Sequence, residues 1–489
     1  MFLYLKVAPS QEKLQWQDES DRDYFKFSTH NCHLQLRKRL AQPHTYASVE
    51  QGRLVLGYRT PNDYEYLRIT IDTHGNLELE GDIHGRLPLF YKHKDDSFYI
   101  CNHYEQLRKG TIALNERQLA SYLYLLGDTY DTLDKDIYIL PPNSKLDYSR
   151  GVVNIEQISR RETIEPSSPT LFPQLLTQHM DFILDEYQLE SVAIEASGGL
   201  DSSSLAVLSS RTGRPTELFA AEFESTYQKR QRQKLDRLAS FTKAQLSLVS
   251  YRPEQHAPLS RFLGQEPVPI YEFSELYYEI LSDVANECAE SRHSIILSGI
   301  GGDELFEHQS IARELEEGSE WKQSLQKRKP HHTSDYMRSL REDYIRSLPD
   351  TVTSHPHPLP RSVYSANVTT NNIFIDRDIW PVAPLADAEL YRYCQGLDLH
   401  FKANKNLLRS WFEAHHAPEP LYQSSQNEYF DTILATTIDR TFTTRAEELG
   451  GLSAIKEAGI APSGNPADFA DTPALTKHQL LVIEQNLRS

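Results

Sequence analysis

The sequence predicts an α/β protein in which a β-rich front part precedes a doubly wound parallel sheet with a helical C-terminal part. Three observations lead to this expectation. In the first 155 positions, short alternating segments such as residues 54–58 and 67–71 are separated by turn residues. After residue 171, apolar strand-like runs alternate with helix-like stretches. Two of these runs end in glycine-rich turns, at residues 197–203 and 298–304, which suits one crevice of a doubly wound sheet.

Length, charge and cysteine usage limit the classes of function. The 489 residues have room for two or three domains. A net charge of −18 argues against a general nucleic-acid binder, because phosphate backbones attract clustered lysine and arginine. No apolar run reaches membrane-spanning length, residues 1–6 are too short for a signal peptide, and the four cysteines lack metal-ligand spacing. We therefore expect a cytoplasmic protein with reduced thiols and neither a nucleic acid nor a membrane as partner.

A polar stretch rich in proline and serine, residues 156–170, divides the chain. We expect a front domain at 1–155, this stretch as the linker, and a second domain at 171–489. The second domain opens with a helix, because apolar residues follow helical spacing between 171 and 184.

The first glycine-rich turn predicts a phosphate site. Residues 191–196 form a strand-like run, and residues 197–203 read Ser-Gly-Gly-Leu-Asp-Ser-Ser before a helix. Gly198 and Gly199 allow positive φ and bring backbone N–H groups close to a ligand. Three serines add hydroxyl donors: Ser197, Ser202 and Ser203. The helix N-terminus favours an anion, and the turn lacks the Gly-Lys-Ser/Thr ending of a Walker loop.

The second glycine-rich turn carries adjacent carboxylates. It follows the apolar run 295–297 and is shaped by Gly299, Gly301 and Gly302. Asp303, together with Asp201 of the first turn, would hold Mg²⁺ against a triphosphate, since oxygen ligands suit that hard cation. Glu304 is a further candidate ligand.

The paired motifs, at 197–203 and at 298–306 (Ser-Gly-Ile-Gly-Gly-Asp-Glu-Leu-Phe), resemble the N-type ATP pyrophosphatases and, within them, the synthetase domain of asparagine synthetases. The resemblance implies an adenine nucleotide α-hydrolase-like fold that uses ATP and Mg²⁺. In that family the first loop grips the β- and γ-phosphates while a substrate oxygen attacks the α-phosphate. It also implies that adenine packs against two strand ends, with these candidates: Ala221, Glu222, Phe223, Ile194, Glu195 and Ala196.

The front part resembles the glutaminase-like (Ntn-type) αβ sandwich domain of asparagine synthetases. The resemblance rests on residues 81–91 (Gly-Asp-Ile-His-Gly-Arg-Leu-Pro-Leu-Phe-Tyr), followed by a second strand, and on residues 132–142. Glutamine-dependent members need a cysteine at the mature N-terminus, where the terminal amine activates its thiol. This chain begins Met1-Phe2 and its first cysteine is Cys32, so we expect an inactive glutaminase-like domain.

Further matches and departures concern the acceptor side of the expected site. Pro-Leu-Ala-Asp at 384–387 stands where the family has Pro-Phe-Leu-Asp, which implies that Asp387 lines the acceptor side. Lys405 and Arg409 match the family's Lys-x-x-Leu-Arg helix; they are either structural or phosphate-facing, and an ordinary basic helix surface is equally open. Ile300 replaces the glutamate of asparagine synthetases and the tyrosine of β-lactam synthetases, and Gln426 stands at or near a family lysine.

Two polar runs have ordinary explanations. Basic residues at 229–234 would neutralise pyrophosphate or attract an acidic substrate, but a solvated helix face is the favoured interpretation. The histidines at 331–332, 355 and 357 lack a carboxylate or cysteine at supporting spacing, so we expect exposed loop histidines rather than metal ligands.

Taken together, these features resemble a glutaminase-deficient branch of the asparagine synthetase superfamily, which includes lasso-peptide macrolactam cyclases and β-lactam synthetases. This resemblance implies an AMP-forming amide ligase that adenylates a side-chain carboxylate, with Asp201, Asp303 and Asp387 as catalytic candidates. A peptide substrate would bring a leader-peptide-binding protein and a protease as partners in natural-product biosynthesis. Two alternatives stay open: a β-lactam- or asparagine-type synthetase for a small amino acid, and a non-catalytic nucleotide-binding homologue. A thiolating or tRNA-modifying pyrophosphatase is disfavoured, because no reactive cysteine pair is visible and the charge is wrong.

Overall fold

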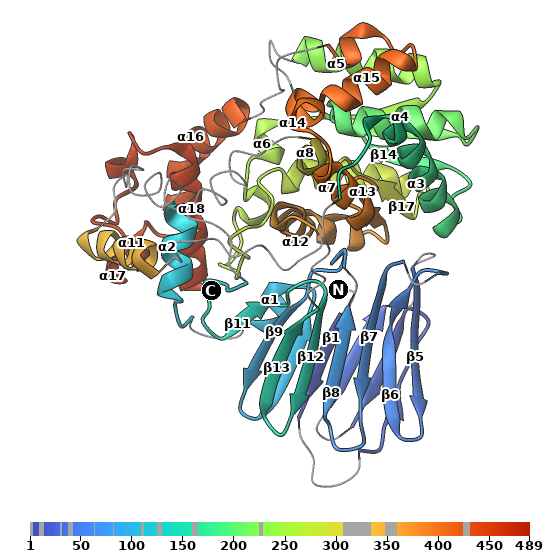
Figure 1. Cartoon of the computed structure of the whole chain (residues 1–489). Coiled ribbons are helices and arrows are strands. Elements are labelled where there is room, and N and C mark those ends of the chain that lie inside the picture. The colour runs from blue at the N-terminus through green and yellow to red at the C-terminus, as the bar shows by residue number, and fades with distance from the viewer. Residues whose placement is uncertain are drawn as a thin grey trace.

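The computed structural model describes residues 3–8, 14–29, 32–37, 43–62, 64–81, 83–108, 112–124, 130–158, 165–223, 228–306, 334–347, 359–423 and 431–489. A front part made of two antiparallel sheets lies below an α/β part, and a group of helices stands beside both (Figure 1).

The front part is a sandwich of two antiparallel sheets. The first sheet contains, in spatial order, β11 (Ile137–Ile139), β9 (Phe90–Lys94), β10 (Ser97–Cys101), β1 (Leu3–Val7), β4 (His33–Arg37), β3 (Tyr24–Ser28) and β2 (Gln17–Asp18). The second contains β13 (Val152–Gln157), β12 (Ser144–Ser149), β8 (Leu77–Gly81), β7 (Tyr66–Ile71), β6 (Arg53–Arg59) and β5 (His44–Glu50). Alternate residues of the strands, such as Leu5, Leu34, Leu56 and Ile69, form one buried core between the sheets.

The helices of the front part differ from the expected αβ sandwich. Among the described residues before position 158, α1 (Tyr104–Leu107) is a single turn and α2 (Glu116–Tyr124) packs away from the sheets. Leu119 and Leu123 of α2 join a core with Ile483 of α18 (Ala474–Arg488). Exposed residues alternate with partly exposed ones along β13, so the outer face carries the exposed residues and needs no helical cover.

The second part contains the expected parallel sheet. Its strands lie in the order β16 (Gln245–Ser250), β15 (Thr216–Glu222), β14 (Val192–Glu195), β17 (Ile295–Leu297) and β18 (Trp380–Val382), and every neighbouring pair is parallel. One face packs against α3 (Phe172–Glu186), α4 (Leu200–Arg211) and α5 (Gln228–Thr242), and the other against α7 (Tyr278–Glu290) and α12 (Arg361–Ile375). Helices on both faces confirm the doubly wound prediction.

One predicted helix begins later than expected. The sequence indicates a helix over 271–288, whereas α7 begins at Tyr278. The backbone N–H of Tyr277 donates to Oε1 of Glu275 at 3.1 Å, and this side-chain bond stabilises a turn ahead of the helix.

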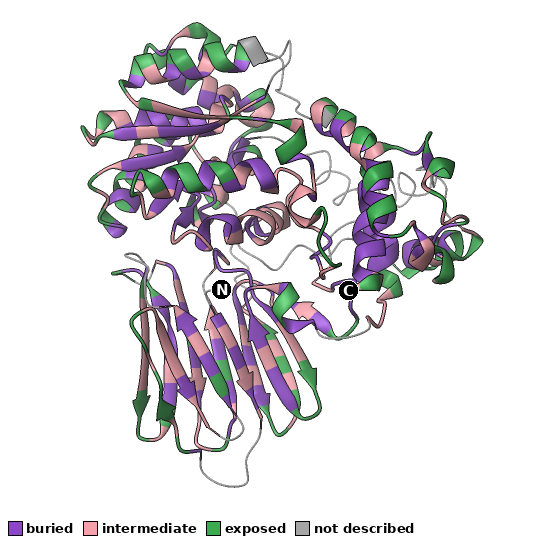
Figure 2. Cartoon of the chain, turned by 180° about the vertical axis from the view of Figure 1, so that it is seen from behind, coloured by how far each residue is buried: buried purple, intermediate pink, exposed green. Residues whose placement is uncertain are grey.

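The C-terminal third is helical, as predicted. Its elements are α13 (Ala388–Gln395), α14 (Leu399–Lys402), η3 (Ala403–Lys405), α15 (Asn406–Ala414), η4 (Glu419–Leu421), α16 (Asp431–Glu448), α17 (Ser453–Glu457), η5 (Pro466–Phe469) and α18. Together with α2 and α11 (Asp335–Ser347), the helices from α16 onward enclose a separate core. The central strands β14 and β17, strand β18 and helix α18 are largely buried, whereas the edge strand β16 is only partly covered (Figure 2).

The sequence led us to expect reduced thiols and no apolar segment of membrane-spanning length. All four cysteines are unpaired and buried. Within the described ranges, no helix combines the length and apolar character needed to cross a membrane.

Candidate active site

The first glycine-rich turn connects β14 to α4, as the sequence predicts. Gly198 has a φ of +83° and Gly199 caps α4, so the chain reverses sharply after Ser197. Oγ of Ser197 accepts a hydrogen bond from the N–H of Gly199 at 3.2 Å, and Oγ of Ser202 accepts one from the N–H of Ser197 at 3.3 Å. Ser203, expected at the phosphates, is fully buried, and its hydroxyl has no partner among the described residues.

The second turn packs directly against the first. A Cβ on Gly299 would lie 2.9 Å from the backbone nitrogen of Ser202, and a Cβ on Gly302 would overlap Cγ of Asp201. Only glycine permits this approach of two backbones, which places Asp201 and Asp303 in one site. Asp303 lies in the first turn of α8 (Gly302–Phe306).

Lys405 bridges the two carboxylates. Its Nζ lies 2.6 Å from Oδ2 of Asp201 and 2.5 Å from Oδ1 of Asp303. Lys405 is buried and has a left-handed backbone, with a φ of +57°. That conformation costs a lysine on the order of 1–2 kcal/mol, so contacts elsewhere must hold it. The sequence signal for this residue was the Lys-x-x-Leu-Arg match, which left its role open.

Burial and the neighbouring charges act in opposite directions on these groups. Burial raises the pKa of Asp201 to about 6, although Lys405 acts to lower it. Burial opposes the charge on Lys405, but Asp201 and Asp303 raise the pKa of the lysine above its usual value. At neutral pH the site therefore holds a cation between two carboxylates.

The two carboxylates fit a magnesium site that also uses substrate phosphates. Oδ1 of Asp201 is buried and has no hydrogen-bond partner among the described residues, while the side chain of Asp303 is 58% exposed. Mg²⁺ in nucleotide sites usually takes one or two carboxylates and completes its shell with phosphate oxygens and water. The part of the chain that the structure describes contains no group of three histidine, cysteine or carboxylate side chains suited to a metal alone.

The strand ends expected at adenine lie beside the first turn. Nε2 of Gln231 on α5 donates to the carbonyl oxygens of Ser197, at 3.0 Å, and Ala221, at 3.2 Å, and so ties the two strand ends together. Sequence reasoning missed Gln231, because it saw only a basic run there. Phe223 is buried and packs on Tyr251, with the ring centroids 5.0 Å apart, so its ring belongs to an aromatic cluster.

Glu195, a further candidate at adenine, is the last residue of β14 and is partly exposed. Burial, assisted by the charge of Glu275, raises its pKa to about 7. The strand end therefore carries a carboxyl group that can be neutral near physiological pH.

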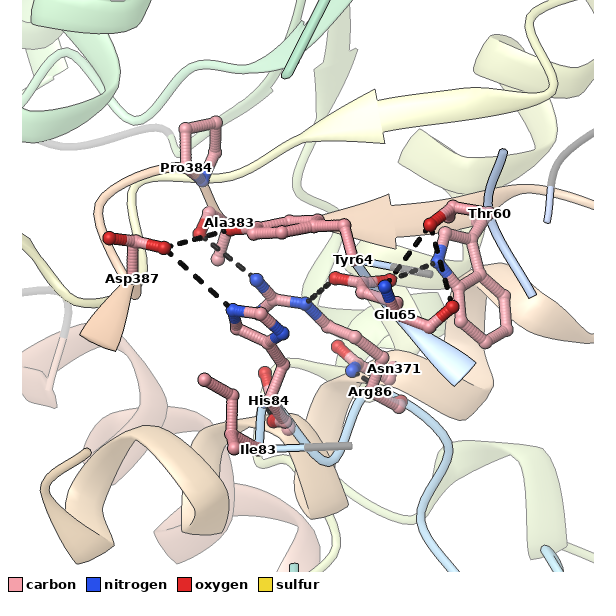
Figure 3. A network of polar contacts seen from close by, with 12 residues as sticks. Thr60, Tyr64, Glu65, Ile83, His84, Arg86, Asn371, Ala383, Pro384 and Asp387 are labelled. Carbon is pink, nitrogen blue, oxygen red and sulfur yellow. Dashed lines mark hydrogen bonds and ion pairs between the residues drawn. The ribbon is translucent and has the colours of Figure 1, made fainter. Parts of the chain in front are cut away.

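Asp387 caps a helix at the seam between the two parts of the chain (Figure 3). Its Oδ1 accepts the N–H groups of Glu389 and Leu390, each at 2.9 Å, and its Oδ2 accepts the hydroxyl of Tyr64 at 3.1 Å. Although burial acts to raise it, hydrogen bonding and the charges of His84 and His179 hold the pKa of Asp387 well below its usual range.

An open cavity of about 970 Å³ lies at the same seam. Asp387, Tyr64, His179 and Phe182 are among the residues that line it, whereas the residues of the two glycine turns are not. The assignment of Asp387 to the acceptor side remains a prediction.

Arg409 has a structural role in this structure. Its guanidinium donates to the carbonyl oxygens of Asn404 and Tyr422, which fastens α15 to the segments on either side. Arg232 of the basic run forms ion pairs with Glu222 and Asp236 and is 44% exposed, as expected for a solvated helix face.

Several predicted residues lie outside the described ranges. They are Gln426 and the histidines at 331, 332, 355 and 357. Ile300 is described, and it packs against an apolar cluster that includes Val363 and Ala386.

Residues 189–369 match the asparagine synthase family, and this stretch contains both glycine turns and both aspartates. This stretch therefore contains an asparagine synthase domain, which supports membership of the asparagine synthetase superfamily. Membership supports an ATP-dependent, amide-forming ligase in general. The match ends before Asp387 and Lys405.

Comparisons with other proteins add weak similarities. An NMN synthetase from Francisella tularensis is 17% identical, with a TM-score of 0.22, and the similarity covers 54% of this chain and 99% of that one. A glutamine phosphoribosylpyrophosphate amidotransferase from B. subtilis, complexed with ADP and GMP, is 10% identical, with a TM-score of 0.19, covering 44% of this chain and 59% of that one. Similarities this weak do not identify a function. A search of curated proteins found no match.

Proposed function

We propose that this protein activates a substrate carboxylate with ATP as an acyl-adenylate and then forms an amide, releasing pyrophosphate and AMP. The observation that carries the proposal is the contact of the two glycine turns around Asp201. There, Nζ of Lys405 lies 2.6 Å from Asp201 and 2.5 Å from Asp303, next to an oxygen of Asp201 that has no hydrogen-bond partner among the described residues. An anion-binding helix N-terminus, a cation and two carboxylates are the groups that positioning a triphosphate requires.

In the first step, a carboxylate oxygen of the substrate attacks the α-phosphorus of ATP. The bond from that phosphorus to the oxygen bridging the β-phosphorus breaks, and pyrophosphate leaves with the bonding electrons. The backbone N–H groups of the first turn and the hydroxyls of Ser197 and Ser202 would bind its oxygens, and Lys405 would offset its charge. Mg²⁺ held by Asp201 and Asp303 would supply further positive charge to the phosphates.

In the second step, an amine of the substrate attacks the acyl carbon. The carbon–oxygen bond to AMP breaks, AMP leaves with the former carboxylate oxygen, and the amine proton passes to solvent. Ile300 occupies an apolar cluster and has no proton to move. An amine held beside the adenylate in the same molecule needs positioning more than a dedicated base, and an effective concentration of that kind can replace several kcal/mol of catalysis.

This reasoning favours a macrolactam cyclase of the lasso-peptide type. The substrate would be a peptide whose Asp or Glu side chain is adenylated and then captured by the peptide's own N-terminal amine. The front part would be a glutaminase-like fold that supplies no ammonia. A leader-peptide-binding protein and a protease would be its partners.

ATP–pyrophosphate exchange tests the proposal. The wild type, Asp201→Asn and a matched surface variant, Asp185→Asn, would be assayed with Asp- and Glu-containing peptides, free Asp and Glu, and small amino diacids. Asp185 is 76% exposed and pairs with Arg214 away from the turns, so its substitution should leave the exchange rate unchanged. We expect exchange with a peptide, lost in Asp201→Asn. Exchange with a small amino acid alone would favour a β-lactam- or asparagine-type synthetase. ATP binding without exchange across the panel would replace the proposal with a non-catalytic homologue.

A further inference from the structure

The front part reaches the synthetase part through residues 383–387. Nη2 of Arg86 donates to the carbonyl oxygen of Ala383 at 3.1 Å, and the hydroxyl of Tyr64 donates to Oδ2 of Asp387 at 3.1 Å (Figure 3). Both donors come from loops at the end of the front sandwich that faces the parallel sheet (Figure 1). The segment 383–387 is thus held from outside at both of its ends.

The same segment lies directly against the second glycine turn. Gly301 has a φ of +95°, and a Cβ on it would lie 2.6 Å from the backbone nitrogen of Ala386 and 2.7 Å from the carbonyl carbon of Leu385. The next residue, Gly302, is in equally close contact with Asp201. The front domain, segment 383–387, the second turn and the first turn therefore form a continuous stack. In it Gly301 touches the backbone of residues 385–386, and Gly302 touches the side chain of Asp201.

The outer end of this stack is anchored in a buried polar network. Nε of Arg86 lies 2.7 Å from Oε1 of Glu65, and Oε2 of Glu65 accepts the indole N–H of Trp380 at 2.9 Å. These three side chains are buried. Breaking a buried charge pair by removing one partner costs about 3–5 kcal/mol, so the network holds one geometry.

Helix α12 fixes the loop that carries Arg86. Three side chains, one helical turn apart, donate to three carbonyls of that loop: Tyr364 to Ile83 at 2.7 Å, Asn367 to His84 at 2.9 Å and Asn371 to Arg86 at 2.7 Å. The loop cannot shift along α12 without losing all three bonds.

We propose that the front domain positions the second catalytic turn, and that Tyr64 is the positioning residue that transmits its placement through Asp387. The inference rests on the proposed function and extends it by giving a role to a front domain expected to lack glutaminase activity. The Tyr64 hydroxyl fixes Oδ2 of Asp387, while Oδ1 caps α13. Asp387 follows Ala386, whose backbone touches Gly301, so a small displacement of Asp387 moves the turn that carries Asp303.

Tyr64→Phe is the substitution that isolates this contact. It removes the hydroxyl and keeps the ring, whose centroid lies 4.5 Å from that of His84 and 5.1 Å from that of Phe182. The matched control is Tyr148→Phe, whose hydroxyl donates to the carbonyl of Asp96 at 2.7 Å wholly within the front sandwich. Each variant loses one hydrogen bond, so both should lower the thermal midpoint by a similar few degrees.

Two measurements then separate positioning from general stability. Hydrogen–deuterium exchange of a peptide covering residues 299–306, measured without ligand, should be about fivefold faster or more in Tyr64→Phe and unchanged in Tyr148→Phe. In ATP–pyrophosphate exchange, Tyr64→Phe should lower kcat about tenfold while the KM for ATP stays within about twofold. Tyr148→Phe should keep wild-type kcat.

Equal deuterium exchange at 299–306 in the two variants would overturn the inference, whatever the catalytic result. The inference would also fail if both variants lowered kcat equally. An inactive wild type would instead count against the proposed function, because the deuterium-exchange comparison needs no turnover.

Discussion

Replacing Lys405 by methionine removes the cation from between Asp201 and Asp303, and the cost can be worked from the pKa of Asp201. That pKa is about 6 with the lysine present, against an ordinary value of 3.8. Without the lysine it rises further, and at about pH 7.5 Asp201 can escape its unpaired charge by binding a proton. Binding that proton costs about 1.4 kcal/mol for each pH unit above the wild-type pKa of about 6. The variant's free energy of unfolding at about pH 7.5 is therefore lower than that of the wild type by at most about 2 kcal/mol from this cause. Asp303 is 58% exposed, so its lost ion pair adds about 0–1 kcal/mol.

The sign of the pH dependence follows from proton linkage. A carboxyl group whose folded pKa is raised costs stability as the pH rises from its unfolded to its folded pKa. In the wild type this loss of stability ends at about pH 6, the pKa of Asp201. In Lys405→Met it continues up to the new, higher pKa. The variant should therefore be close to the wild type at about pH 5.5, and about 2 kcal/mol less stable at about pH 7.5.

Urea unfolding at both pH values measures the effect. The matched control is Lys477→Met: Lys477 is also buried, and its Nζ lies 2.8 Å from Oδ1 of Asp439, whose side chain is 51% exposed. This ion pair does not involve Asp201, so the control should lose the same free energy at both pH values. In an Asp201→Asn background, the loss of stability caused by Lys405→Met should no longer depend on pH. An equal loss of stability at the two pH values in Lys405→Met would show that Asp201 does not bind a proton when the lysine is removed.

Three further predictions concern charge, backbone packing and metal. Glu272 is buried, and burial raises its pKa to about 8, so the stability of the wild type falls as the pH rises from 4.5 to about 8. Glu272→Gln removes this carboxyl group and should reduce the fall by up to about 5 kcal/mol, as measured by thermal melts across that pH range. Gly301→Ala should abolish pyrophosphate exchange and cost more than about 2 kcal/mol. Gly213 has a φ of +74°, and an added Cβ would meet no atom of the described residues within 4 Å, so Gly213→Ala should cost about 1–2 kcal/mol and keep exchange activity. Asp303→Asn should keep the wild-type melting temperature but raise the Mg²⁺ concentration for half-maximal exchange about tenfold; an unchanged requirement would remove Asp303 from the metal site.

The sequence predicted the parallel sheet and its two glycine turns well, because both are local patterns. Apolar runs of strand length mark β14 and β17, and the glycines after them permit a close approach that no other residue allows. Even the contact of the turns was foreseeable, since parallel strands bring their carboxyl ends to one edge of a sheet.

The side-chain partners at that edge could not be read from the sequence. Lys405 is 204 positions from Asp201, and its placement depends on how η3 and α15 pack over the turns. Gln231 stood within a charged run that gave no sign of one buried amide. Asp387 looked like an acceptor-side carboxylate by motif, yet its oxygens cap α13 and accept a bond from Tyr64, 323 positions away. Such contacts arise only when distant segments meet.

The fate of the substrate's carboxylate oxygen distinguishes adenylation from phosphorylation of the substrate. The carboxylate that supports pyrophosphate exchange would be labelled with ¹⁸O and converted with ATP to the amide, and the nucleotide product analysed by mass spectrometry. Adenylation transfers one carboxylate oxygen to the α-phosphorus, so the account predicts AMP carrying one ¹⁸O atom. Unlabelled nucleotide released as ADP, with ¹⁸O in inorganic phosphate, would show attack at the γ-phosphorus and would contradict the account.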